Sequence, residues 1–154
     1  MKSIKSFKSI LSGLGGSLTL TLLHQLLKGH VTHAPRMDLL GKQALTRMLS
    51  LSSTPMPPEK DLYNITLAGD ITGNALYYSI VDRMPGNKVV NGALLGVAAG
   101  VGAVVLPGKL GLSPKYSNAT RKTQVLTVAI YLAGGIIAGL LSQQINQKGP
   151  KLLK

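Results

Sequence analysis

The residues best suited to chemistry are an acid and an amide four positions apart, Asp70 and Asn74, near the middle of a predicted helix of membrane length. Residues at this spacing lie on one face of a helix, and Thr66 and Tyr77 share that stripe. A carboxylate in the middle of a membrane-spanning helix is costly in free energy and marks paths for protons, cations or polar solutes. One interpretation is therefore a polar intramembrane site made by these four residues. The other is that Asp70 is paired with a cation or hydrogen-bonded across a helix bundle and binds nothing.

The three histidines are the other candidates for acid–base or metal chemistry: His24, His30 and His33. The gap between His30 and His33 is poor for a single helix face, and only one carboxylate, Asp38, lies close by in the sequence. We therefore predict headgroup contacts or local hydrogen bonds for these side chains, and neither a metal site nor a cofactor. No nucleotide-binding or hydrolase motif is present. A lipid-directed enzyme using a histidine with Asp38 or Asp70 is our third-ranked hypothesis, and we favour a protein that is not an enzyme.

Glycines recur every four residues in three segments of the chain, which leaves one side of each predicted helix as bare backbone. In water, each glycine costs a helix roughly 1 kcal/mol relative to alanine. In lipid, such faces let helices approach closely. We therefore predict that these glycines pack helices together, namely Gly69, Gly73, Gly92, Gly96, Gly100, Gly135 and Gly139.

The segment 88–106 is the strongest membrane-spanning candidate, because Val89 to Leu106 contains no charged residue. In a helix, these residues rise about 27 Å, close to the hydrocarbon thickness of a bilayer. Three further segments have membrane length: 10–27, 60–82 and 124–145. The segment 60–82 is unusually polar, so we expect the other helices to shield it from lipid.

Two segments allow alternative interpretations. The run 10–27 follows several lysines, as the apolar part of a signal peptide does, but no small-residue cleavage site follows it. We therefore predict an uncleaved helix there. The segment 37–50 is amphipathic and too short to span a membrane. We predict an interfacial helix lying along the membrane, and a soluble helix capping the bundle is the alternative.

The predicted fold is all-α, a single membrane domain over residues 1–154. It is an integral membrane bundle of about four transmembrane helices plus one short amphipathic interfacial helix. The alternative is a soluble protein with the glycine-rich run as a buried core helix. The remaining residues of so short a chain could not wrap two such runs, which argues against it.

The charge distribution predicts contact with anionic lipid headgroups. Lys and Arg number 17 against 5 Asp and Glu, a formal net charge of +12, and the basic residues lie between and outside the apolar runs. With one Phe and no Trp, the chain offers few stacking surfaces for bases, so we predict no nucleic-acid partner. Four spans would place both termini on one side of the membrane. Lysines near the first and last spans favour the inside for them.

The functional prediction follows from this architecture. We predict a structural or accessory subunit that associates with itself or with a larger membrane complex, in a bacterial inner membrane. The alternative is a small transporter or channel for protons, cations or a polar solute that uses Asp70 and Asn74.

Overall fold

A computed structural model describes residues 2–147, with side chains from Phe7 onward. All regular structure in this part of the chain is helical, which confirms the all-α prediction. The elements are α1 (Lys2–His30), α2 (Met37–Leu51), α3 (Glu59–Ser79), the 3₁₀ helix η1 (Ile80–Arg83), α4 (Lys88–Lys109), α5 (Lys115–Asn118) and α6 (Arg121–Gln147). Every predicted helical segment lies inside these helices, with the predicted 60–82 continuing from α3 into η1.

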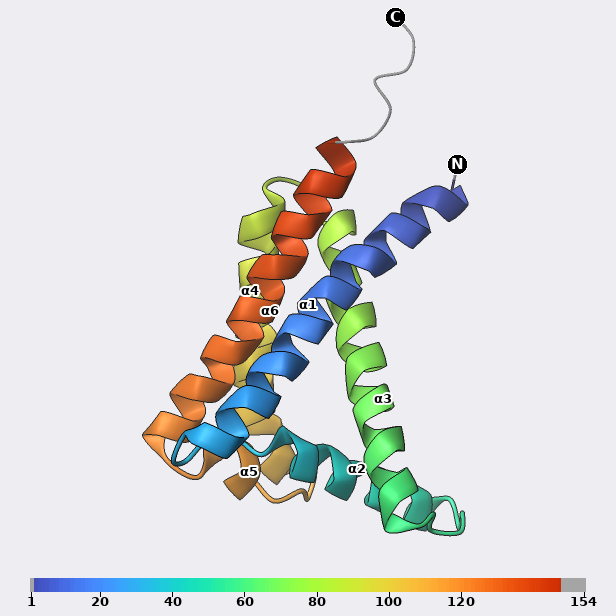
Figure 1. Ribbon diagram of the computed structural model, residues 1–154, viewed down its shortest axis with the longest axis vertical. Coiled ribbons are helices and arrows are strands. Elements are labelled where there is room, and N and C mark those ends of the chain that lie inside the picture. The colour runs from blue at the N-terminus through green and yellow to red at the C-terminus, as the bar shows by residue number, and fades with distance from the viewer. Residues whose placement is uncertain (1, 148–154) are drawn as a thin grey trace, which may run out of the picture.

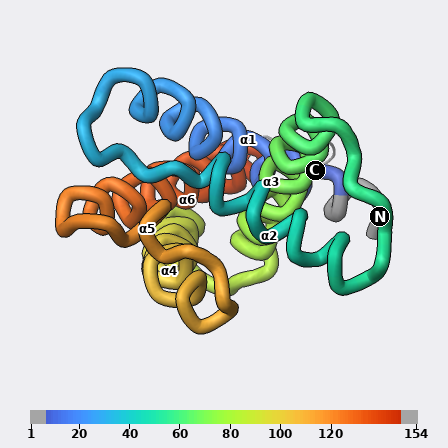
Figure 2. Tube along the Cα trace, turned by 90° about the horizontal axis from the view of Figure 1, so that it is seen from below, coloured from blue at the N-terminus to red at the C-terminus, as the bar shows by residue number. Residues whose placement is uncertain are grey.

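The long helices α1, α3, α4 and α6 run lengthwise through the molecule and alternate in direction (Figure 1). The short helices α2 and α5 lie across one end of them (Figure 2). The first and last described residues lie at the opposite end (Figure 1). Helix α6 packs against α4 and α1, and α1 in turn packs against α3.

Three helical segments among the described residues are long and apolar enough to cross a membrane: Phe7–His30, Lys88–Lys109 and Arg121–Gln147. They belong to α1, α4 and α6. Large apolar side chains on these helices are exposed, for example Leu22 at 62% and Val125 at 67%. A surface of this kind is normal toward lipid and unusual toward water. The molecule is thus a helical bundle suited to a membrane.

The contact between α4 and α6 depends on glycine. A Cβ atom added to Gly92 would lie 2.1 Å from the carbonyl oxygen of Gly135, and one added to Gly96 would lie 2.6 Å from that of Tyr131. A Cβ atom on Gly139 would lie 2.4 Å from the carbonyl oxygen of Lys88. No side chain fits in these places unless the two backbones move apart.

Helix α1 approaches both of its neighbours through glycine as well. A Cβ atom on Gly13 would lie 2.1 Å from the carbonyl oxygen of Ala75 in α3. A Cβ atom on Gly16 would lie 2.6 Å from the carbonyl oxygen of Gly134 in α6. These two contacts fix the line along which α1 crosses between α3 and α6.

The buried core lies where α1, α3 and α6 meet. Its cluster of buried side chains consists of Leu20, Tyr78, Ile130, Tyr131 and Ala138. The hydroxyl of Tyr78 donates a 2.7 Å hydrogen bond to the carbonyl oxygen of Tyr131, which links α3 to α6 inside the bundle. The tyrosine therefore keeps its polar atom satisfied although it is fully buried.

Hydrogen bonds hold the α2 end of the molecule together. The backbone N–H of Arg36 donates to the carbonyl oxygen of Tyr116 at 2.7 Å, next to α5. At the far end of α2, Arg47 Nη1 donates to the carbonyl oxygen of Gly111 at 3.0 Å. These bonds tie α2 to α5 and to the residues that follow α4, and α2 lies across that end of the bundle (Figure 1).

Candidate functional site: a polar pocket between α1, α2 and α3

A polar pocket lies between α1, α2 and α3. It encloses about 30 Å³, enough for one or two water-sized groups. Its wall is formed by Thr21, His24, Gln25, Lys28, Pro35, Met37, Asp38, Tyr63, Thr66, Leu67 and Asp70. Most of the residues on this wall carry hydrogen-bonding side chains, unlike the core cluster beside it.

The α1 wall of the pocket holds two buried polar side chains without protein partners. His24 is 8% exposed and Thr21 is 9% exposed. Neither ring nitrogen of His24, nor Oγ1 of Thr21, makes a hydrogen bond within the described part of the chain. The imidazole packs edge-on against the ring of Tyr131, with 5.9 Å between the ring centroids. Because buried polar atoms are nearly always hydrogen-bonded, these three atoms favour a polar group in the pocket.

The α3 wall supplies a half-buried carboxylate, Asp70. The side-chain amide of Asn74 donates to Asp70 Oδ1 at 3.0 Å and to the Asp70 carbonyl oxygen at 2.9 Å. The ion pairs of residues 7–147 involve other acids, so no described cation neutralises Asp70. The cation pairing that the sequence left open is therefore not formed among the described side chains, and the carboxylate is available to the pocket.

The other two members of the predicted polar stripe lie apart. Thr66 also lines the pocket, and its hydroxyl donates to the carbonyl oxygen of Leu62 at 2.7 Å. Tyr77 instead reaches α4, where its hydroxyl donates to the carbonyl oxygen of Leu95 at 3.0 Å. The fold thus brings Asp70, Asn74 and Thr66 to one place and sends Tyr77 to another.

Charged side chains surround the α2 end of the pocket. Asp38 forms ion pairs with Arg36, at 3.1 Å from Nε to Oδ1, and with Lys28, at 3.7 Å from Nζ to Oδ2. Burial alone would raise the pKa of Asp38. The hydrogen bonds from Arg36 and the positive charges of Arg36 and Lys28 outweigh this and hold that pKa below its ordinary value of 3.8. Asp38 is therefore ionised at neutral pH.

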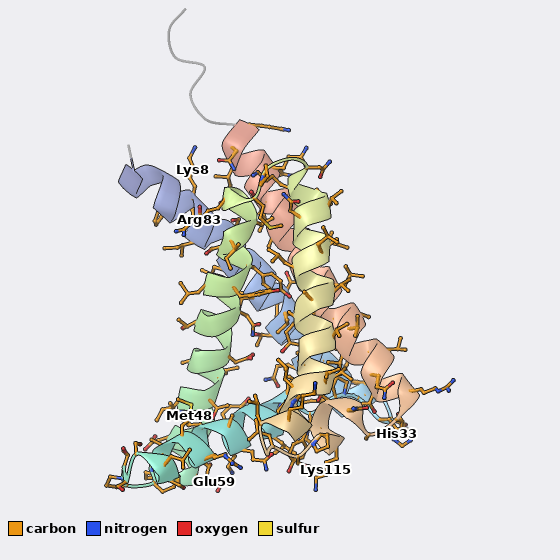
Figure 3. All side chains as sticks on the ribbon, turned by 180° about the vertical axis from the view of Figure 1, so that it is seen from behind. Lys8, His33, Met48, Glu59, Arg83 and Lys115 are labelled. Carbon is orange, nitrogen blue, oxygen red and sulfur yellow. The ribbon has the colours of Figure 1, made fainter. Side chains whose placement is uncertain are left out.

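A second, apolar cavity adjoins the polar pocket on the side of α4. It is an open groove of about 460 Å³ between α2, α3 and α4, which stand around it in Figure 3. Its α4 wall consists mostly of alanine and glycine, and its α2 wall includes Met37 and Leu40. Asp70 and Met37 line both cavities, so these two residues form the border between them.

The predicted packing glycines divide into two groups. Gly92, Gly96, Gly100, Gly135 and Gly139 all lie at the contact between α4 and α6. By contrast, Gly69 and Gly73 are exposed, and a Cβ atom on either would meet no described atom within 4 Å. Within one chain, these two glycines of α3 make no close helix contact.

The two histidines outside the pocket contribute no side chain to it. His30 Nδ1 donates to the carbonyl oxygen of Leu26 at 2.8 Å, and His33 is exposed. No group of three or more metal-binding side chains occurs among residues 7–147.

Sequence reasoning gave one residue the wrong surroundings and missed another. Headgroup contacts or local hydrogen bonds were predicted for His24, whereas its ring is buried in the bundle and makes no hydrogen bond within the described part of the chain. Asp82 was treated only as the end of a helix, yet its carboxylate accepts hydrogen bonds from Ser12, Ser142 and Asn146. The signal that could have identified Asp82 is scarcity, because it is one of only five acids in the chain.

The pocket thus combines an unpaired carboxylate, an imidazole and a hydroxyl. A set of this kind can hold a proton, an ammonium group or a small polar solute. No protein-family model, curated protein or solved structure matches this chain. Its function is therefore inferred from the pocket and the helices around it.

Proposed function

We propose that this chain is a small integral membrane protein that binds a cation or polar solute in the polar pocket, and that it serves the transport of that solute or of protons. One observation carries the proposal. Two buried polar side chains, His24 and Thr21, face a cavity without protein partners, and the cavity also holds the carboxylate of Asp70. Binding a polar group there would satisfy atoms whose burial otherwise costs free energy.

We further propose that α3 crosses the membrane beside α1, α4 and α6, while α2 lies along the membrane surface. The 21 residues of α3 rise about 31 Å in a helix. Asp70 and Thr66 turn toward α1 and α2, which shields them from lipid. Exposed lysines near the bundle ends, such as Lys109 and Lys115, would contact anionic headgroups of a bacterial inner membrane.

Transport suits this site because Asp70 has no fixed countercharge among the side chains of residues 7–147. A carboxylate held by a neighbouring lysine or arginine would be neutralised permanently, whereas Asp70 can exchange a proton for a cation. The polar pocket reaches from Asp70 to Asp38 and Lys28 near α2, so a polar path leads from the middle of α3 toward one end of the bundle.

Equilibrium binding tests the proposal. The protein is placed in lipid nanodiscs and incubated with radiolabelled methylammonium or sodium ions. We expect at least one of these cations to bind, and Asp70→Asn to weaken that binding at least about tenfold, because a charge-assisted contact is lost. Asp61→Asn is the matched control, since Asp61 is an exposed acid on the same helix. If neither cation binds, or if Asp70→Asn binds as the unchanged protein does, the proposal is wrong.

A second candidate function is that of an accessory subunit that associates through α3. It is favoured by Gly69 and Gly73, which leave bare backbone exposed halfway along that helix. A helix of a second copy or of a larger complex would find close contact there. Light scattering in mild detergent tests this candidate. Replacing both glycines by leucine should reduce the mass of the assembly, while Gly29→Leu should not. A monomer before any substitution would contradict it.

A further inference from the structure

We propose that the solute is a primary alkylammonium ion, with its ammonium group in the polar pocket and its apolar chain in the groove between α2, α3 and α4. The inference rests on the proposed function, since it names the class of solute for the same site. Its basis is that a small polar cavity and a larger apolar one meet at a carboxylate.

The polar pocket matches an ammonium group in size and in hydrogen bonding. Its volume of about 30 Å³ admits a group the size of a water molecule, and a primary ammonium is of that size. Such a group donates three hydrogen bonds and accepts none. Three acceptors on the wall have no hydrogen-bond donor among the described residues: a ring nitrogen of His24, Oγ1 of Thr21 and Oδ2 of Asp70, since Asn74 donates to Oδ1.

The charge of the site selects a cation as well. Asp70 faces the pocket without an ion-pair partner, whereas Asp38 and Lys28 at the other end are paired with each other. A positive group beside Asp70 therefore neutralises the one unpaired carboxylate that lines the pocket. A neutral solute would leave that carboxylate uncompensated.

The groove supplies the place for an apolar chain. Its α4 wall consists largely of side chains too small to fill it, namely Ala98, Ala99, Gly102 and Ala103. Opposite them lie Leu40 and Ala44 of α2. Because Asp70 and Met37 border both cavities, an ammonium held by Asp70 would have its first methylene groups at the entrance of the groove.

A free single-chain amine fits better than the amine of a phospholipid headgroup. In a phospholipid, a phosphate follows the ammonium after two carbons, and a cavity of about 30 Å³ has no room for it. The phosphate would also be repelled by Asp70. The site is therefore assigned to an amine whose ammonium is attached directly to an apolar chain.

Competition binding tests the inference. Radiolabelled methylammonium bound to the protein in nanodiscs of phosphatidylcholine and phosphatidylglycerol is displaced by unlabelled methyl-, butyl- or octylammonium. Empty nanodiscs correct for partition into lipid. We expect affinity to rise about fourfold for each methylene group that enters the groove. Asp70→Asn should weaken the binding of all three ions at least about tenfold.

Filling the groove separates its contribution from that of the carboxylate. Ala98 lines the groove and is exposed, so Ala98→Leu should fold normally and block the chain. This variant should bind methylammonium with unchanged affinity, and it should no longer bind octylammonium more tightly than methylammonium. Val97→Leu enlarges an exposed residue of α4 outside the groove, so this variant should still bind octylammonium more tightly than methylammonium.

The outcomes are distinct. If octylammonium binds no tighter than methylammonium, or if Ala98→Leu leaves its gain intact, the inference is overturned while the proposed function stands. If neither methylammonium nor sodium binds at all, both fall. Nanodiscs that contain phosphatidylethanolamine should give the same affinities, and loss of octylammonium binding in them would assign the site to the lipid headgroup and overturn the inference.

Discussion

At the scale of single residues, Asp82 is the acid most engaged by other elements. Its carboxylate accepts a hydrogen bond from Ser12 of α1 at 3.2 Å and one from Asn146 of α6 at 2.9 Å, and it also accepts from Ser142. The side chain of Lys88 donates to the carbonyl oxygen of the same residue at 3.1 Å. Asp82 thus ties η1 to α1 and to the C-terminal part of α6.

We predict that Asp82→Ala lowers the free energy of unfolding by about 2 kcal/mol, because donors from two helices lose a charged acceptor. Thermal unfolding in detergent, followed by circular dichroism, measures the effect. Asp61→Ala is the control and should cost less than about 1 kcal/mol, since Asp61 is an exposed acid in the first turn of α3. Equal losses of stability for the two variants would show that the hydrogen bonds from α1 and α6 to Asp82 do not stabilise the fold.

Asp38 makes the stability depend on pH. Its pKa is held below 3.8 by Arg36 and Lys28 despite burial, so the folded state binds the proton less tightly than the unfolded state does. The resulting stabilisation is fully present above about pH 4 and is lost as pH falls through the lowered pKa of the folded state.

We therefore predict that unfolding midpoints measured between pH 7 and pH 3 fall less steeply for Asp38→Asn than for the unchanged protein. The reason is that the variant has no carboxylate at this position to protonate. Arg36→Gln, which removes the main partner, should flatten the dependence in the same direction. Parallel curves for all three proteins would show that this ion pair does not stabilise the fold.

Contacts within one helix could be predicted at the residue scale, and contacts between helices could not. The spacing of Asp70 and Asn74 placed them on one helix face, and the fold joins them by hydrogen bonds. The burial of His24 depends on how closely α1 approaches α6 and on the ring of Tyr131 beyond it. That approach is set by backbone contacts such as Gly16 with Gly134, which no local pattern specifies.

At the scale of elements, the glycine contact between α4 and α6 makes the strongest demand on the sequence. A Cβ atom on Gly92 would lie 2.1 Å from a backbone oxygen of Gly135, and the reverse distance for a Cβ atom on Gly135 is also 2.1 Å. Backbone cannot yield as a flexible side chain does, so alanine at either position must push the helices apart.

We predict that Gly92→Ala lowers the free energy of unfolding by about 1–3 kcal/mol, as overpacking typically does. Gly29→Ala is the matched control, because its added methyl group meets no described atom within 4 Å. It should be neutral or slightly stabilising, since alanine favours the helix. Thermal unfolding of both variants in the same detergent measures the difference in stability between them. A Gly92→Ala protein as stable as Gly29→Ala would mean that the two helices are not in contact as described.

Helix ends could be predicted where local residues determine them. Gly86 adopts a φ of +85° in the turn before α4, and Asn87 caps α4 by accepting from the backbone N–H groups of Val89 and Val90. Both features follow from residue type. Helix α5 was not predicted, because its four residues are too few to show a period. The sequence left open whether α2 lies on a membrane or caps the bundle, and its position across one end suits both.

At the scale of the whole molecule, the two ends of the bundle are chemically different. Lys8 and Arg83 lie at the end where the described chain starts and stops, whereas His33, Glu59 and Lys115 lie at the end formed by α2 and α5 (Figure 3). Cations lie at both ends, so their presence alone does not orient the chain in a membrane. The direction of α3 between the two ends is what carries Asp70 into the middle of the bundle.

The central claim is that α3 crosses the membrane, although its polar residues keep it out of the set of apolar spans. The chain has no cysteine, so single cysteines can be labelled selectively at two exposed positions, Met56 before α3 and Arg83 at the end of η1. The decisive measurement is their reaction with a membrane-impermeant maleimide in intact and in permeabilised cells. We predict that in intact cells only one of the two reacts, and that both react after permeabilisation. Equal reaction of both positions before permeabilisation would place both ends of α3 on the same side and contradict the claim.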